Sequence, residues 1–245
     1  MPAPFLDPAH DPDPVEVIPG TGDVLLVCEH AGRAIPRALG DLGIAPEEMD
    51  RHIAWDIGAE ALARELAARI GATLVLQRYS RLVIDCNRPP LGLQSIPEES
   101  DGTPVPANRG LSAAEKGARV ADIFDPFALA VHRAIVAPGL RLAVSIHSFT
   151  PALAGVARPW HAGFCARQDG YAKAAIARLS AEAGLTLAVN QPYQIDDETD
   201  WFIPRAAEPS GLPHALIEIR NDGLRSDADI ARWADRLVPC LTELP

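Results

Sequence analysis

Two histidines that lie far apart in the chain each come directly after a short apolar segment. His30 follows the segment 23–28 (DVLLVC), and His147 follows the segment 142–146 (LAVSI). Segments of this kind are typical of strands buried on both faces, and open α/β sheets bind ligands where such strands end. The two imidazoles are therefore expected to meet at one edge of a sheet and to hold a metal ion. For either histidine taken alone, a hydrogen-bonded structural role is the alternative interpretation.

A catalytic zinc ion usually has three protein ligands and one position open to water, so one more ligand is needed. We predict Asp56, because it stands at the start of the helix expected after the first strand. His52, in the same segment, is an alternative. Glu29 is another, although neighbouring residues on an extended backbone point in opposite directions, which hinders joint ligation with His30.

Glu218 lies inside the apolar run 214–220 (HALIEIR). Burying a carboxylate there without a function would cost on the order of several kcal/mol. Beside a zinc ion, Glu218 would act as general base toward the activated water and then as general acid toward the leaving amine. A buried ion pair with Arg220 is the alternative, because alternation along a strand puts both side chains on the same side.

The segment 81–88 (RLVIDCNR) concentrates polar residues around a short predicted strand. The planar fork of an arginine suits carboxylates, and an asparagine beside it adds an amide. Arg81, Asn87 and Arg88 are therefore expected to select an anionic substrate. A structural pair between Arg81 and Asp85 is the alternative interpretation.

The elements expected around these residues alternate between strands and helices. Strands are predicted at 23–28, 73–77, 82–85, 142–146, 186–189 and 215–219, and helices at 57–70, 112–124, 126–137, 170–183 and 227–244. This alternation predicts a three-layer α/β/α fold with a mixed, largely parallel central sheet. Residues 89–110 are rich in Pro, Gly, Ser and Asn, which is typical of a lid or binding loop. We expect a single domain over 1–245, with an extended N-terminal tail at 1–20.

Composition narrows the class of partner. The net charge of −11 and pI of about 5.0 disfavour nucleic-acid binding, and an anionic ligand would need a local group of arginines. The four cysteines form no CxxC pair, which favours a reduced, cytoplasmic setting without disulfides. No basic segment precedes an apolar run and no apolar stretch approaches membrane-spanning length, so neither a signal peptide nor a membrane span is expected. We expect a monomer or a small homo-oligomer.

Five motifs make the chain resemble the N-formylglutamate amidohydrolase family. They are CEHAG at 28–32, HIAWDIGA at 52–59, YSRLVIDCNR at 79–88, IHSFTP at 146–151 and IEIRND at 217–222. Each motif alone would be weak, but their order over most of the chain makes the resemblance specific. It implies a fold similar to the zinc carboxypeptidases and aspartoacylases, and a zinc-activated water that attacks an amide.

The resemblance also implies roles for individual residues. His30 and His147 would bind zinc, and Glu218 would shuttle the proton. Asn87 and Arg88 would hold the carboxylate of a small anionic N-acyl amino acid, such as the N-formyl-L-glutamate of histidine catabolism.

Other implied roles are less closely matched. Arg81 would polarise the scissile carbonyl or bind a second carboxylate, and Arg220 is expected to assist substrate binding. The carboxypeptidases take their first two ligands from an HxxE motif, whereas this chain has Arg33 at the position of that glutamate. The formylglutamate enzymes tend to read PHSG where this chain reads EHAG, so family membership does not by itself determine the substrate.

Three other functions compete with an amidohydrolase of small molecules. The first is a peptidase or peptidoglycan amidase with a wide cleft, which depends on whether the 89–110 loop closes over the site. The second is a non-catalytic module that binds carboxylates through Arg81, Arg88 and Arg220. The third uses Cys28 as a nucleophile beside His30, which the expected burial of this cysteine disfavours.

Overall fold

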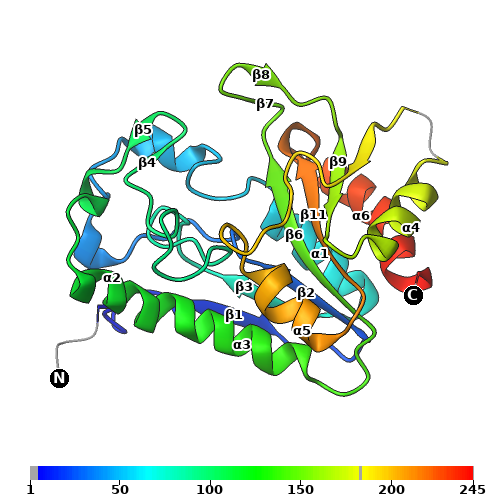
Figure 1. The fold of residues 1–245 in the computed structure, drawn as a ribbon, viewed down its shortest axis with the longest axis horizontal. Helices are drawn as coiled ribbons and strands as arrows, with labels where there is room; N and C mark the ends of the chain where they lie inside the picture. Colours follow the sequence, from blue (N-terminus) through cyan, green and yellow to red (C-terminus); the bar gives the residue numbers. More distant parts are fainter. Residues whose placement is uncertain (1–4, 182–183, 245) are drawn as a thin grey trace.

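Residues 5–181 and 184–244, which the computed structural model describes, form a seven-stranded sheet with helices on both sides (Figure 1). In spatial order the strands are β1 (Val15–Ile18), β3 (Thr73–Gln77), β2 (Val24–Cys28), β6 (Leu142–Phe149), β11 (His214–Arg220), β9 (Ala162–Cys165) and β10 (Leu187–Val189). The central strands β3, β2, β6 and β11 run parallel to one another. β1 is antiparallel at one edge, and β9 is antiparallel to β11 and carries β10 at the other. The predicted mixed, largely parallel sheet is confirmed.

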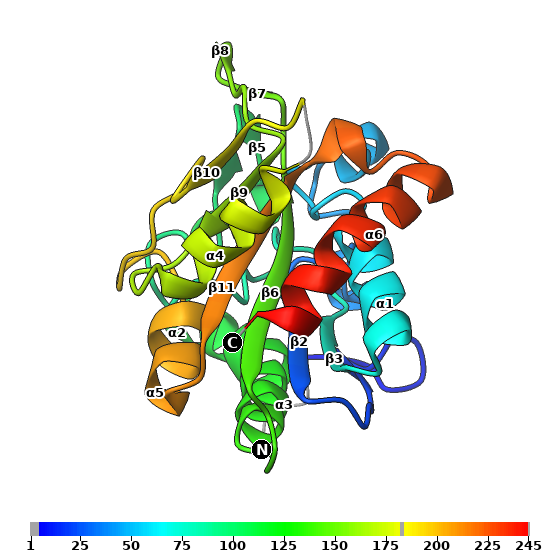
Figure 2. The ribbon, with the colours of Figure 1, turned by 90° about the vertical axis from the view of Figure 1, so that its right-hand side faces the viewer.

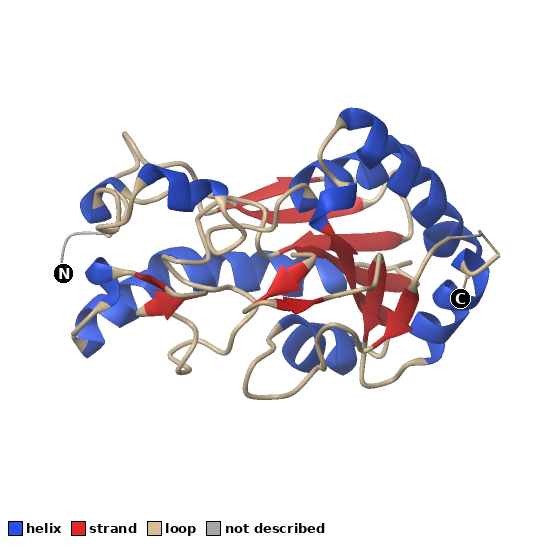
Figure 3. Cartoon of the chain, turned by 90° about the horizontal axis from the view of Figure 1, so that it is seen from above, coloured by secondary structure: helices blue, strands red, loops and turns tan. Residues whose placement is uncertain are grey.

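Two groups of helices cover the two faces of this sheet. α1 (Ala59–Ile70), α4 (Gly170–Leu179) and α6 (Asp227–Glu243) pack on one face (Figure 2). α3 (Asp125–Ile135) packs on the other face, together with the π-helical turn η5 (Phe202–Ala207), which leads into α5 (Glu208–Ser210) (Figure 1). Figure 3 shows from above that helices lie on both sides of the strands. The chain thus has the three-layer α/β/α architecture that the alternation of elements predicted.

β2 shows why the central strands are continuous apolar segments in the sequence. All five of its residues are buried. Leu26 packs into the cluster beneath α1, and Leu25 and Val27 pack into the cluster beneath α3. Each such side chain contributes about 1.5–3 kcal/mol of burial free energy, so the strand is fixed from both sides. The residues that follow it are consequently held in a defined position.

α1 forms because its apolar residues recur at helical spacing. Leu62, Ala63 and Leu66 lie on its buried face. The helix ends at Gly71, whose φ of 66° is in the left-handed region that glycine adopts without strain. The structure confirms the helix predicted at 57–70, although its first turn begins only at Ala59.

The helices predicted at 112–124 and 126–137 are one continuous element. Ser112 opens it with the predicted capping box, in which its side chain and that of Glu115 bond each other's backbone N–H. α2 (Ala113–Arg119) then runs through the π-helical turn η4 (Val120–Phe124) into α3. Pro126 does not break the helix because it stands in the first turn of α3, after the widened π turn.

Three sequence predictions are wrong in part. Residues 82–85 form a turn rather than a strand: the Ser80 hydroxyl bonds the carbonyl of Ala54, and the Val83 N–H donates to the carbonyl of Ser80. These local bonds occupy the groups that a sheet neighbour would need. Part of the expected tail is strand β1, whereas residues 1–4 lie outside the described residues. The helix expected at 170–183 ends at Leu179, and residues 182–183 also lie outside the description.

The remaining elements are short and lie mainly near the ends of the strands. They are η1 (Arg37–Leu39), η2 (Pro46–Asp50), β4 (Glu99–Ser100), β5 (Thr103–Pro104), η3 (Pro106–Asn108), β7 (Ala152–Leu153), β8 (Val156–Ala157) and η6 (Asn221–Gly223). β4–β5 and β7–β8 are hairpins that project beyond the sheet (Figure 1). Within the described ranges, no helix combines the length and apolar character needed to cross a bilayer.

Candidate metal centre

Three adjacent strands bring the candidate residues to one edge of the sheet. His30 follows β2, His147 lies on the neighbouring β6, and Glu218 lies on β11. β6 continues to Phe149, so the prediction that the strand ends before His147 is wrong; its pairing with β11 extends as far as Arg220. Glu218 is paired in register with His147, which puts both side chains on the same face.

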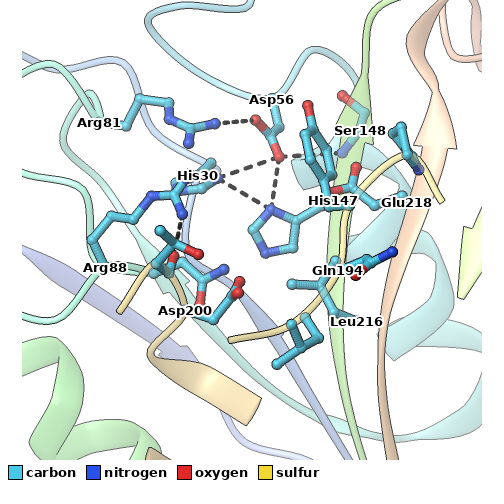
Figure 4. Close-up of a pocket in the computed structure, with 15 residues that line it drawn as sticks. His30, Asp56, Arg81, Arg88, His147, Ser148, Gln194, Asp200, Leu216 and Glu218 are labelled. Atoms are coloured by element: carbon cyan, nitrogen blue, oxygen red, sulfur yellow. Dashed lines mark hydrogen bonds and ion pairs between the residues drawn. The ribbon is translucent and has the colours of Figure 1, made fainter. Parts of the chain in front are cut away.

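Asp56 completes the group from the loop that precedes α1, where its N–H donates to the carbonyl of His30 at 3.0 Å. The Nδ1 atom of His147 lies 2.8 Å from Asp56 Oδ2 and 3.1 Å from His30 Nδ1 (Figure 4). His30 Nδ1 is 3.4 Å from the same oxygen. The three residues predicted as ligands therefore form one buried group with the atom types and spacing that could hold a metal ion.

The outer nitrogen of each ring faces a buried carboxylate. His30 Nε2 lies 2.6 Å from Asp85 Oδ1, and His147 Nε2 lies 3.0 Å from Glu29 Oε2. Glu29 is oriented in turn by the hydroxyl of Ser145, which donates to it. A carboxylate accepts hydrogen bonds, so each ring keeps its proton on Nε2 and turns the lone pair of Nδ1 inward. This second layer of carboxylates is the usual arrangement around histidines that bind metals.

The inward-facing atoms fit a cation. Two Nδ1 lone pairs and one carboxylate oxygen converge within 2.8–3.4 Å, and acceptors at that spacing repel one another unless a cation or proton lies between them. Burial alone would lower the pKa of His147, but the charges of Glu29 and Asp56 outweigh burial and hold that pKa well above its ordinary value. A site that attracts positive charge so strongly, with two imidazoles and one carboxylate, is suited to zinc.

Asp56 is held as the charged form by several groups. Burial would raise its pKa, but the two histidines outweigh this and lower it. The N–H of Ser148 donates to Asp56 Oδ2 at 3.2 Å, and Arg81 Nη1 donates to the other oxygen at 3.2 Å. The carboxylate can therefore serve as an anionic ligand without losing its other partners.

Glu218 lies beside this group and differs from Asp56 in its environment. Its side chain is buried, and Oε2 has no hydrogen-bonding partner among the described residues. The alternative of an ion pair with Arg220 is therefore not what the structure shows for this oxygen. Burial raises the pKa of Glu218 to about 7, the range in which a carboxyl group can both accept and donate a proton at neutral pH.

These side chains line a cavity of about 270 Å³. Asn87 and Arg88 also line it, although both have protein partners: Asn87 Oδ1 accepts from the N–H of Phe202 at 3.0 Å, and Arg88 Nη1 donates to the carbonyl of Thr199. Arg81 reaches the wall while its Nη2 bonds Asp85 at 2.7 Å. The expected Arg81–Asp85 pair is thus present, and it brings the arginine to the site.

Other sequence candidates lie elsewhere. The prediction that Arg220 binds substrate is not supported, because its Nε bonds Asp222 at 2.8 Å and its side chain lines a different cavity. The strand ends at Arg220, and the side chain turns back over the following turn. His52 contacts Asp101 at 3.5 Å rather than joining the ligand group, and Glu29 faces the outer nitrogen of His147 rather than the inward-facing Nδ1 atoms. Cys28 is fully buried, which raises the pKa of its thiol and suppresses nucleophilic reactivity.

Sequence reasoning missed three residues around the cavity. The sequence indicates Asp85 only as a partner for Arg81. Its contact with His30 depends on the turn at 82–85, where the sequence pattern predicts a strand. Tyr193 and Asp200 come from the segment between β10 and η5, which the fold places across the cavity. Burial raises the pKa values of both side chains. No motif in that segment indicated this position.

A family model described as N-formylglutamate amidohydrolase matches residues 22–224, a range that contains every residue of the candidate metal centre. The chain belongs to the N-formylglutamate amidohydrolase family. The family resemblance drawn from the five motifs is therefore confirmed. No curated protein matches this chain.

Solved structures extend the comparison for this family member. It is similar to the gene product Atu2144 from Agrobacterium tumefaciens, with 38% identity, a TM-score of 0.91, and coverage of 98% of this chain and 97% of the other. It is also similar to the N-formylglutamate amidohydrolase from Ralstonia eutropha JMP134, with 19% identity, a TM-score of 0.71, and coverage of 95% and 97%. The second likeness shows the fold alone, and both extend over nearly the whole of each chain.

Proposed function

We propose that this chain hydrolyses the amide bond of a small N-acyl amino acid, such as N-formyl-L-glutamate, with the help of a zinc ion. The observation that carries the proposal is the convergence of His30, Asp56 and His147 on one point beside a buried, unpartnered Glu218. Family membership supports an amidohydrolase, and the cavity of about 270 Å³ supports a small substrate.

His30, Asp56 and His147 would hold the ion, which supplies a Lewis acid that activates water and polarises a carbonyl. Glu218 accepts a proton from the attacking water and donates it to the amine nitrogen as the carbon–nitrogen bond breaks. In the metal-free centre burial raises its pKa to about 7, so this side chain can take up and release a proton near neutral pH. Arg81 keeps N–H groups beyond those it gives to Asp56 and Asp85, and these stabilise the oxygen on which negative charge develops.

Arg88 and Asn87 provide the substrate specificity in this proposal. A guanidinium recognises a carboxylate through paired N–H donors, and the amide of Asn87 adds a further donor. The protein carries a net charge of −11, so an anionic substrate needs this local positive charge to bind. We expect the physiological substrate to carry at least one carboxylate.

Metal analysis and kinetics on three variants test the proposal. Purified protein should contain zinc or regain activity when zinc is added after chelation, with free amino acid released from N-formyl-L-glutamate. His147→Ala should lose both metal and activity. Glu218→Gln should keep the metal but lose about 10²–10⁴-fold in kcat, which is the usual contribution of general acid–base catalysis.

Arg220→Ala is the matched control, because Arg220 lies on the same strand as Glu218 but lines a separate cavity. It should leave kcat and KM close to those of the parent protein. If hydrolysis survived in both His147→Ala and Glu218→Gln, the proposed chemistry would be wrong.

A further inference from the structure

A second cavity, of about 510 Å³, opens beside the metal centre. Its walls include Arg81, Arg88 and Tyr193, and the same three residues line the first cavity. The two spaces therefore lie on either side of one partition made by these side chains. The two cavities are therefore adjacent, and a ligand long enough to contact both would lie against Arg81 and Tyr193.

The volumes show that the first cavity alone suits only a very small ligand. Cavities that enclose larger, drug-sized molecules occupy roughly 300–1,000 Å³, and the first cavity falls just below that range. The second cavity falls in the middle of it. An N-formyl amino acid would fill the first space and leave the larger one to water.

The 89–110 segment forms a wall of the second cavity instead of closing over the metal centre. Gln94, Glu99 and Asp101 line this space, and none of them lines the first cavity. Arg51 anchors the β4–β5 hairpin by donating to Asp101 Oδ2 at 3.0 Å and to Thr103 Oγ1 at 2.6 Å. The hairpin is thereby held apart from the metal centre, with the second cavity between them.

The opposite wall is anchored as well. Leu153, in the β7–β8 hairpin, lines the second cavity, and Arg158, directly after that hairpin, donates to the hydroxyl of Tyr193 at 3.1 Å. The guanidinium of Arg158 also lies 5.1 Å from the centre of the Tyr193 ring. Tyr193, which lines both cavities, is therefore held in position by a residue that lines neither of them.

The lining of the second cavity indicates the chemistry of its occupant. Most of its side chains are polar, with Arg81, Arg88 and His52 set against Glu99 and Asp101. Only a few apolar residues, Ile53, Pro97, Leu153 and Ala154, interrupt them. Such a surface offers both hydrogen-bond donors and acceptors to a polar group of a ligand.

We propose that the substrate is an amide longer than an N-formyl amino acid, with a polar extension of about the size of one more amino acid residue that occupies the second cavity. This inference rests on the proposed amide hydrolysis and names its substrate class. Hydrolysis adds a hydroxyl group to the carbonyl carbon and a hydrogen to the nitrogen, which gives an acid and an amine. One of these two products carries the polar extension. The extension lies on the acyl side or on the amine side of the bond that breaks.

Three compounds distinguish these cases when the zinc-loaded protein is assayed for release of primary amine. N-formyl-L-glutamate lacks an extension, N-succinyl-L-glutamate carries one on the acyl side, and N-formyl-L-glutamyl-L-glutamate carries one on the amine side. We expect one extended compound to exceed N-formyl-L-glutamate about tenfold or more in kcat/KM, because filling a preformed pocket raises that ratio by such factors.

Gln94→Trp and Leu93→Trp form a matched pair of variants for the same assay. Gln94 lines the second cavity, whereas its neighbour Leu93 is fully exposed and lines neither cavity. Gln94→Trp should lower the ratio of kcat/KM for the extended compound to that for N-formyl-L-glutamate about tenfold. Leu93→Trp should leave this ratio unchanged.

Two negative outcomes are distinguishable. If N-formyl-L-glutamate were hydrolysed faster than both extended compounds, or if Gln94→Trp left the ratio unchanged, the second cavity would not be a substrate site and the proposed hydrolysis would stand. If none of the three compounds were hydrolysed, the proposed function would itself be overturned, and this inference with it.

Discussion

At the scale of single residues, the metal centre depends on side chains that do not face it. Glu29 and Asp85 each receive the outer N–H of one histidine, and this contact determines which ring nitrogen is left as the ligand. Glu29 is the better position to test by mutation, because Asp85 has further partners. Asp85 also bonds Arg81 and the backbone N–H of Asn87. Within the described part of the chain, the Glu29 side chain bonds only His147 and Ser145.

Glu29→Gln should weaken zinc binding about tenfold, because a neutral amide accepts the histidine proton less strongly and lowers the basicity of Nδ1. Competition with a chromophoric chelator measures the dissociation constant directly. Ser145→Ala removes the hydroxyl that orients Glu29, so it should also weaken zinc binding, but by a smaller factor. An unchanged zinc affinity in Glu29→Gln would show that the outer carboxylate does not tune the ligand.

The raised pKa of Glu218 predicts how the free energy of unfolding depends on pH. Burial raises this pKa from its ordinary value of 4.5 to about 7, so the folded protein holds the proton more tightly than the unfolded chain does. The ionised carboxylate therefore costs stability, and this cost grows as pH rises from 4.5 to 7 and is constant above. In metal-free protein, Glu218→Gln should raise the free energy of unfolding at pH 8 by about 3 kcal/mol.

The same comparison at pH 4.5 serves as the control for Glu218→Gln. Both proteins then carry an uncharged side chain at this position, so their free energies of unfolding should be nearly equal. Urea titrations at the two pH values measure the difference. Equal effects of the substitution at both pH values would contradict the raised pKa.

At the scale of elements, the antiparallel strand β9 shapes the cavity through a glycine. Gly163 is paired with Glu218, and a Cβ atom at this position would lie 1.6 Å from the carbonyl oxygen of Gln191. The absence of a side chain lets the segment that carries Tyr193 lie directly against the sheet. The sheet and the outer wall of the cavity are thus in contact next to Glu218.

Gly163→Ala should therefore lower the free energy of unfolding by about 1–3 kcal/mol and reduce activity, because the Gln191 backbone must move away. Gly117→Ala is the control from another element: it lies within α2, and nothing lies within 4 Å of a Cβ built there. It should increase stability by roughly 0.5–1 kcal/mol, the usual gain in a helix interior. Thermal and urea unfolding of both variants check the opposite signs.

The sequence predicted those elements whose pattern is determined by burial. β2, β6 and β11 are apolar runs because helices cover both faces, and α1 has the spacing of one buried face. It did not predict β9 or the turn at 82–85, which depend on pairing and hydrogen bonds between distant segments.

The residues of the candidate site likewise include some that the sequence predicted and others that it did not. His30, His147 and Glu218 were identifiable because polar residues interrupt or follow apolar strands. Tyr193 was not, because its place at the cavity depends on how the segment after β10 crosses the sheet. Arg220 lines a different cavity, where its guanidinium bonds Asp222 and the carbonyls of Arg158 and Pro159; alternation along the strand does not predict these contacts.

At the scale of the whole molecule, the metal centre joins three segments that are distant in the chain. His30 follows β2, Asp56 precedes α1 and His147 lies on β6, so an ion bound to all three connects the first half of the chain to the second. The unfolded chain cannot hold the three ligands together. An ion bound by these three residues would therefore favour the folded state of the chain.

Removing the ion with a chelator should lower the melting temperature by roughly 10 °C, if free zinc exceeds its dissociation constant about 1,000-fold beforehand. Differential scanning calorimetry with and without added zinc measures the shift. His147→Ala should melt at the same temperature in both conditions. A parent protein whose melting temperature did not change when zinc was added would not have the proposed ligand set.

The pairing of β6 with β11 sets Glu218 opposite His147 through backbone hydrogen bonds, whereas the second cavity is lined by residues of two hairpins outside the sheet. Insertions and deletions in those hairpins would change the second cavity without shifting Glu218 relative to His147. Under the proposed function, such changes would alter which acylated compound fits and would leave the residues that break the bond in place.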